Sequence, residues 1–193
     1  MQKTRHGVFE TNSSSCHSFT AAEDKSVRTK CPTLSHKDHK IHLELGEFQR
    51  GDPCGTETDP RTKLQYLVTI IGCITPVYND DGEDVSMGQL YWEYDSDKEN
   101  YKANLKEMAE GIMACPEFKE VEAAAMAVWP ECNGIVIGSK KPGTVDHESV
   151  PWDWKAKDDE HRKEPWEFFK EDMLKMSLEE FLGTNAVLHL DSD

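Results

Sequence analysis

Several side chains near the start of the sequence are of types that can bind and act on an anion. The run 11–18 consists almost wholly of small hydrogen-bonding residues. In a tight turn the hydroxyls and backbone N–H groups of such residues can converge on one anion. Arg5 would supply the counter-charge, and His17 a general acid or base. Asn12 and Ser14 complete this candidate catalytic set in the opening motif.

The same run also fits a purely structural role. Short apolar stretches flank it at 8–9 and 19–22, as in a strand, a polar turn and a second strand whose serines bind the local backbone. A segment this polar must be held by polar contacts or be disordered. The flanking apolar stretches favour a packed arrangement of residues 1–20.

A second candidate group, Asp146 and His147, follows a turn predicted at 141–143. An aspartate can orient an imidazole, and Ser149 or one of the serines at 13–15 would be the nucleophile. Adjacent side chains on a strand point to opposite faces, however, so the structural alternative is a polar contact that ties this turn to the opening motif. The sequence contains no nucleophile elbow, P-loop or Rossmann glycine pattern.

The string from Arg5 to Ser18, R-x-x-V-F-E-T-N-S-S-S-x-H-S, resembles the opening of a family of small proteins from phages, prophages and Firmicute bacteria. The resemblance is specific at this string and weaker in three later patches, 45–48, 63–67 and 145–149. It implies a mobile-element origin and inhibition of a bacterial RNA-guided nuclease, the activity of an anti-CRISPR protein. It carries no catalytic residue over to this chain.

Carboxylates are concentrated between residues 79 and 99, where aromatic side chains are interleaved with them. Charge runs are often only solvated faces. Carboxylates that steer and rings that anchor nevertheless suit an interface with a basic, partly apolar groove. Duplex DNA carries one phosphate charge per roughly 1.7 Å of axis, so a dense row of carboxylates can stand in for it. The expected binding residues are Asp80, Asp81, Asp84, Trp92, Asp95 and Asp97.

The overall composition favours a protein partner over nucleic acid. The chain has 22 Lys and Arg against 37 Asp and Glu, a formal charge of −15, whereas phosphate binding is built from Lys and Arg. We therefore expect a partner protein with a basic surface, and contact with nucleic acid only through that partner. No apolar run approaches the length of a membrane span, and the N-terminus lacks a secretory apolar region, so we expect a cytoplasmic protein without membrane contact.

Histidine and cysteine spacing gives little indication of a metal site. His36, His39 and His42 are evenly spaced, with Cys31 and Cys54 as the nearest thiols. Zinc sites usually show closer pairing of their ligands than this. The six cysteines include no C-x-x-C pair, and we expect reduced thiols, no metal and no cofactor.

The hydrophobic pattern predicts one α+β domain over 1–193, with a short mixed sheet packed against three to four helices. Helices are expected from Pro60, with Asp59 as its cap, and from Lys98 to Ala114. After Pro116 a short helix is favoured over a strand, and helical periodicity returns over 166–174, followed by a second start signal in a capping box at Ser177 and Glu180. Strands are expected at 41–45, 134–138 and 186–190, and a loop over 46–55.

These features together predict an acidic binding protein of phage or prophage type that inhibits a host nucleic-acid enzyme. By resemblance, the expected target is a CRISPR RNA-guided nuclease. The alternative is a small enzyme that acts on a phosphate ester or nucleotide through the opening motif. A structural phage protein is a third possibility.

Overall fold

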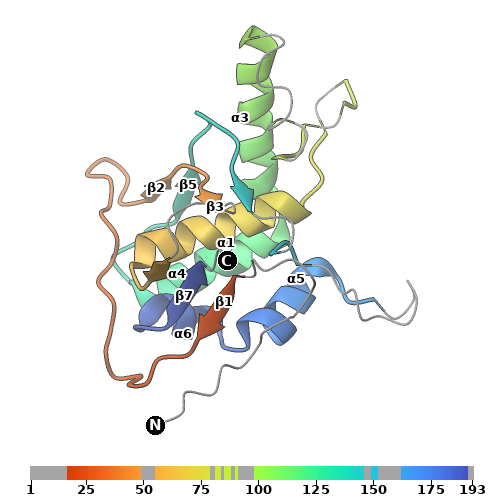
Figure 1. Cartoon of the computed structure of the whole chain (residues 1–193). Coiled ribbons are helices and arrows are strands. Elements are labelled where there is room, and N and C mark those ends of the chain that lie inside the picture. Colours follow the sequence, from red (N-terminus) through yellow and green to blue (C-terminus); the bar gives the residue numbers. More distant parts are fainter. Residues whose placement is uncertain are drawn as a thin grey trace.

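The computed structural model describes residues 17–48, 55–78, 81–83, 85–87, 90, 98–145, 149–151 and 162–190. The helices described are α1 (Pro60–Ile74), α3 (Lys98–Ala114), α4 (Pro116–Val128), α5 (Pro165–Phe168), the π-helix η2 (Phe169–Leu174) and α6 (Leu178–Gly183). The strands described are β1 (Ser18–Thr20), β2 (Ile41–Leu43), β3 (Glu47–Phe48), β4 (Gly55–Glu57), β5 (Ile135–Ile137), β6 (Thr144–Val145) and β7 (Val187–Leu190). This combination confirms the α+β class (Figure 1).

The described strands form three small sheets, where the sequence led us to expect one mixed sheet. β7 lies between β1 and β4 and is antiparallel to both. β2 pairs in parallel with β5, and β3 pairs in parallel with β6. The parallel pairs therefore join residues 41–48 to residues 135–145, which lie beyond α1, α3 and α4 in the sequence. In β2, Ile41 and Leu43 are buried and His42 is exposed, as expected of a half-buried strand.

The prediction of a loop over 46–55 is wrong at both ends of that range, because β3 occupies Glu47–Phe48 and β4 begins at Gly55. Phe48 is buried, and its ring lies edge-on to that of Tyr66 with centroids 5.1 Å apart. Glycine and proline near these residues are local turn signals. The pairing of β3 with β6 and the packing of Phe48 are distant contacts that such signals do not contain.

α1 lies at the centre of the molecule (Figure 1). Asp59 caps it as expected, since its side chain accepts a 2.9 Å hydrogen bond from the N–H of Thr62, and Pro60 takes the first position. The expected core residues Leu64, Leu67, Val68 and Ile71 are fully buried. Each contributes roughly 1.5–3 kcal/mol of transfer free energy.

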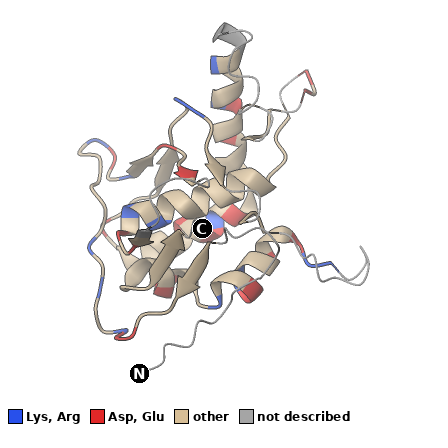
Figure 2. Ribbon diagram, viewed as in Figure 1, with Lys and Arg blue, Asp and Glu red and all other residues tan. Residues whose placement is uncertain are grey.

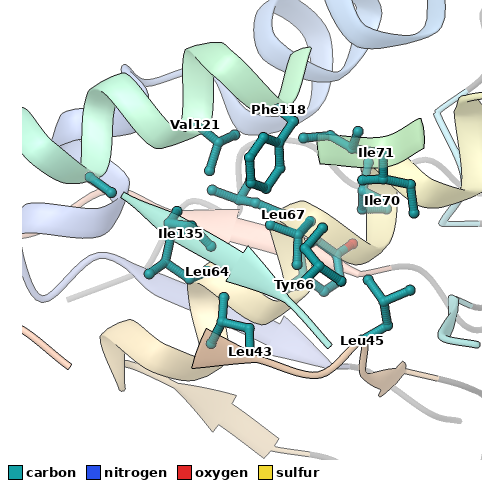
Figure 3. Packing of buried hydrophobic residues seen from close by; sticks show 14 of the residues in the cluster. Leu43, Leu45, Leu64, Tyr66, Leu67, Ile70, Ile71, Phe118, Val121 and Ile135 are labelled. Atoms are coloured by element: carbon teal, nitrogen blue, oxygen red, sulfur yellow. The ribbon is translucent and has the colours of Figure 1, made fainter. Parts of the chain in front are cut away.

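Burial on α1 extends beyond the expected face. Tyr66 and Ile70 are also fully buried, because α1 packs against α3, α4, α6 and β6 rather than against one layer. Figure 3 shows Leu64 and Leu67 of α1 beside Phe118 and Val121 of α4 and Ile135 of β5.

Lys63 is the charged residue of this central helix that is buried completely. Its Nζ donates hydrogen bonds to the carbonyl oxygens of Phe181 (2.8 Å) and Thr184 (2.9 Å), at the end of α6. The last carbonyls of a helix lack partners within the helix. Lys63 therefore caps α6 from the neighbouring helix. Burial lowers the pKa of Lys63 to about 8, and the negative charge of Asp59 opposes this shift.

The C-terminal helices follow the predicted order with one change of geometry. α5 continues into the π-helix η2, which ends at Lys175 in the left-handed region (φ 56°). Ser177 then caps α6, accepting a 3.0 Å hydrogen bond from the N–H of Glu180. Within the described residues, no helix has both the length and the apolar character needed to cross a bilayer.

Candidate functional site

His17 is the residue of the N-terminal candidate set that the structure describes. It immediately precedes β1, and it is 7% exposed. Its Nδ1 lies 3.1 Å from the hydroxyl of Tyr66, and the two rings meet edge-on at 5.4 Å between centroids. Arg5, Asn12 and Ser14 lie outside the described residues.

The strand period explains why His17 faces the core. Side chains two positions apart on an extended chain point to the same face. Phe19 is also buried, and its ring makes edge-on contacts with Tyr66, Phe169 and Phe181 at 5.6–5.9 Å. The pairing of β1 with β7 thus turns both His17 and Phe19 towards α1.

Ser149 connects the turn after β6 to this buried histidine. Its hydroxyl oxygen accepts a 3.1 Å hydrogen bond from the backbone N–H of His17, and the residue is 0% exposed. This is the kind of polar contact that the sequence analysis offered as the structural alternative to catalysis. Asp146 and His147, the catalytic candidates of the same turn, lie outside the described residues. The described contacts of His17 and Ser149 favour a structural role for both.

The acidic region begins with a loop that is fixed at both of its ends. Val77 and Val85 are buried, and the N–H of Val85 donates a 2.8 Å hydrogen bond to the carbonyl oxygen of Val77. Val77 also packs closely on α3, since a Cβ added to Gly111 would lie 2.7 Å from Cγ1 of Val77. We refer to residues 78–84, between these two valines, as the acidic loop. The base of the acidic loop is therefore closed by this hydrogen bond and packed on α3.

The described residues of the acidic loop face solvent. Asp81 and Glu83 are exposed, and Gly82 (φ +80°) has no atom within 4 Å of where a Cβ would stand. Tyr78 is 63% exposed. Of the expected binding residues, Asp81 is thus placed on the surface, while Asp80, Asp84, Trp92, Asp95 and Asp97 lie outside the described residues.

Sequence reasoning missed Tyr78. The rings selected from the sequence were those between residues 91 and 94, inside the acidic stretch. Tyr78 directly precedes that stretch and follows a helix-ending proline, Pro76. Its position next to Asp80 and Asp81 was a signal of the same kind.

Charge is distributed unevenly along the chain. Residues 79–97 hold seven carboxylates and no Lys or Arg, and so carry −7 of the formal charge of −15. The first 78 residues contain ten Lys and Arg against nine Asp and Glu. Figure 2 shows acidic colouring on the loop that follows α1, whereas the segment between β1 and β2, on the other side of the molecule, carries both basic and acidic residues. The acidic loop is thus part of a strongly negative region.

Of the residues weighed as metal ligands in the sequence, His36, His39, His42 and Cys31 lie within the described part of the chain and Cys54 lies outside it. His42 pairs with Asp38 at 3.1 Å. Burial raises the pKa of Cys31 to about 11 and that of Cys73 to about 12, whereas a nucleophile or metal ligand needs the thiolate. Among the residues described, no three His, Cys, Asp or Glu side chains gather closely enough to hold a metal ion. That the protein needs no metal remains a prediction.

A pocket of about 580 Å³ lies where residues 25–29 pass α4 and α6. Lys25 and Arg28 line it together with Glu179 and Glu180. Lys25 and Glu180 form an ion pair at 2.8 Å. Because both charge signs line the pocket and one pair is already formed, it has no single ligand chemistry.

No protein-family model, curated protein or solved structure matches the chain. The family resemblance of residues 5–18 therefore stays a prediction from the sequence.

Proposed function

We propose that this chain is an acidic binding protein of phage or prophage type that inhibits a host nucleic-acid enzyme. The observation that carries the proposal is the acidic loop, which presents Asp81 and Glu83 to solvent from a base held by buried Val77 and Val85. Exposed carboxylates in a strongly acidic stretch of sequence attract a basic partner and repel nucleic acid. The partner is therefore a protein with a basic surface.

The mechanism follows from competition for the same cations. A nucleic-acid enzyme holds its substrate with Lys and Arg side chains that contact phosphates. Carboxylates that pair with those side chains exclude the phosphates without any chemical step. The resemblance of the opening motif makes a CRISPR RNA-guided nuclease the first target to test.

The rival proposal is an enzyme acting on a phosphate ester or nucleotide. It requires an imidazole that can reach substrate and exchange protons with it. His17 is instead buried with its Nδ1 against the Tyr66 hydroxyl. The binding function is therefore the one that the described geometry supports better.

The test is a titration of a guide-loaded RNA-guided nuclease with the purified protein, read as cleavage of a matched DNA. An inhibitor that occupies the nuclease reaches its endpoint near one molecule per nuclease. A catalyst acts at far lower ratios and becomes more effective with time of incubation. Loss of activity at a ratio of about one to a hundred would contradict the binding proposal.

Matched charge variants show whether the acidic loop carries the effect. Asp81→Asn combined with Glu83→Gln removes two charges from the loop. Glu23→Gln combined with Glu164→Gln removes two charges from exposed residues on other segments. The loop variant is expected to inhibit more weakly than the control variant at equal concentration. Equal inhibition by both would show that the acidic loop is not the contact.

A further inference from the structure

Tyr78 is the most exposed of the large hydrophobic side chains in the described part of the chain, at 63%, followed by Val27 at 46% and Met126 at 39%. Tyrosine offers a large rigid contact area at low entropic cost, and it is enriched among the residues that dominate binding energy at interfaces. An exposed tyrosine beside exposed carboxylates is therefore worth testing as a contact residue.

The position of Tyr78 is fixed by its neighbours. Val77 is buried against Gly111, and the 2.8 Å hydrogen bond from Val85 closes the base of the loop. Adjacent side chains of an extended segment point in opposite directions. Anchoring Val77 inwards thus holds the ring of Tyr78 outwards, so little conformational freedom of the backbone is lost on binding.

The charges that follow Tyr78 in the chain favour a cation as its partner. Asp81 and Glu83 are exposed on the same loop, within a stretch that lacks Lys and Arg. An aromatic face attracts cations, and among the natural side chains Arg combines a delocalised charge with a planar group that stacks on the ring. Nucleotide bases also stack on tyrosine, but the exposed carboxylates of Asp81 and Glu83 on the same loop disfavour the phosphates that come with them.

We propose that Tyr78 anchors the interface by stacking on an arginine side chain of the partner, while exposed Asp81 and Glu83 of the same loop attract the cations of that partner. This inference rests on the proposed function and specifies its partner: a protein surface rich in arginine rather than lysine. Tyr78 supplies the discrimination between the two cations, and the carboxylates supply attraction to both.

The probes are fluorescent nona-arginine and nona-lysine peptides, whose dissociation constants for the full-length protein are measured by fluorescence anisotropy. The informative quantity is the ratio of the nona-lysine to the nona-arginine constant. Carboxylates alone favour Arg to some degree, so the change in the ratio on mutation is the readout. Tyr78→Ala is expected to lower the ratio roughly three-fold or more, as loss of a cation–π contact implies.

Further variants separate the ring from its other properties. Tyr78→Phe keeps the aromatic ring and is expected to show the same ratio of dissociation constants as the wild type. Tyr78→Leu keeps an apolar side chain without an aromatic face and is expected to lower the ratio as much as Tyr78→Ala does. Met126→Ala, at another exposed apolar residue, is expected to leave it unchanged. Unfolding temperatures verify that each variant is folded.

The two proposals fail in distinguishable ways. An unchanged ratio in folded Tyr78→Ala overturns the arginine anchor; if both peptides still bind and weaken with Asp81→Asn plus Glu83→Gln, the acidic binding function stands. If neither peptide binds the wild-type protein, both proposals fail. Tyr78-dependent binding of a fluorescent oligothymidylate would overturn the anchor in favour of base stacking.

Discussion

Nζ of Lys63 on α1 lies 2.8 Å from the carbonyl oxygen of Phe181 on α6, joining two helices that are far apart in the sequence. The ammonium group is fully buried, and its described hydrogen bonds go to backbone carbonyls rather than to a carboxylate. An uncharged amine still has two N–H groups for these two acceptors. The contact can therefore outlast loss of the proton.

This relationship predicts a rise of stability with pH. The pKa of Lys63 is about 8 in the folded protein against an ordinary 10.5. Between these values the unfolded chain holds a proton that the folded chain has lost, so the free energy of unfolding increases with pH, by up to ~1.4 kcal/mol per pH unit. Urea unfolding of the wild type and of Lys63→Met between pH 7 and 10 measures the effect.

The difference in unfolding free energy between these two proteins removes the contribution of other titrating groups. It is expected to be flat below pH 8 and to grow above it. Lys106→Met, at a side chain that is 69% exposed, is the control and should show no such trend. A difference that stays flat up to pH 10 would show that Lys63 titrates normally.

Gly111→Ala is expected to destabilise the protein, although helix propensity alone predicts a gain of about 1 kcal/mol in mid-helix. The added Cβ would lie 2.7 Å from Cγ1 of Val77, a short branched side chain with little freedom to move. Overpacking of this kind costs roughly 1–3 kcal/mol. Chemical denaturation gives the sign directly.

Ala103→Gly, at an exposed position of the same helix, is the matched control. It is expected to cost about 1 kcal/mol through propensity alone. If Gly111→Ala instead stabilised the protein, the contact between Val77 and α3 would not be close enough to hold the acidic loop.

Ser149→Ala is expected to cost about 1–3 kcal/mol of stability, because it removes the acceptor of a buried N–H group. The folded variant should still bind the partner at low temperature, since Ser149 has no place in the acidic interface. Complete loss of activity with unchanged stability would instead identify Ser149 as a reacting group.

Neutralising the acidic stretch is expected to slow association with the partner and to reduce its salt sensitivity, since exposed charges are screened within ~8 Å at physiological ionic strength. The variant replaces five residues together with asparagine: Asp80, Asp81, Asp84, Asp95 and Asp97. Binding kinetics with the nuclease at two salt concentrations separate the association rate from the dissociation rate. An unchanged association rate would remove steering from the mechanism.

Trp92→Ala is expected to raise the dissociation rate of the complex rather than to slow association. Loss of a buried aromatic anchor typically costs ~2 kcal/mol or more and accelerates dissociation. The unfolding temperature of the variant must be measured alongside, because removing a tryptophan that packs in the core would lower the stability of the protein instead. Slower association without faster dissociation would contradict an anchoring role.

Local signals in the sequence predicted the helices well. Asp59 and Pro60 marked the start of α1, Ser177 marked the start of α6, and the apolar stripe placed α3 at Lys98–Ala114. Capping and periodicity are set by residues within a few positions of each other. Such signals are therefore present in a short window of sequence.

Pairing between segments that are distant in the sequence could not be predicted from such local signals. Nothing near Glu47 indicates that its strand partner is Thr144, and nothing near Lys63 indicates that its carbonyl acceptors lie in α6. The candidate sites likewise differ in how far the sequence alone could predict them. Composition indicated the acidic region, whereas the burial of His17 depends on a contact with Tyr66 that only the fold creates.

The position of β7 also sets the order in which the chain can complete its structure during synthesis. β1 and β4 both pair with β7, which follows both of them in the sequence and is therefore made after them. At ribosomal speeds of about 5–20 residues per second, Phe19 waits on the order of ten seconds or more for its strand partner. β1 is thus made long before the strand that secures it, and a nascent chain stalled before residue 187 exposes β1 and β4 without their shared neighbour.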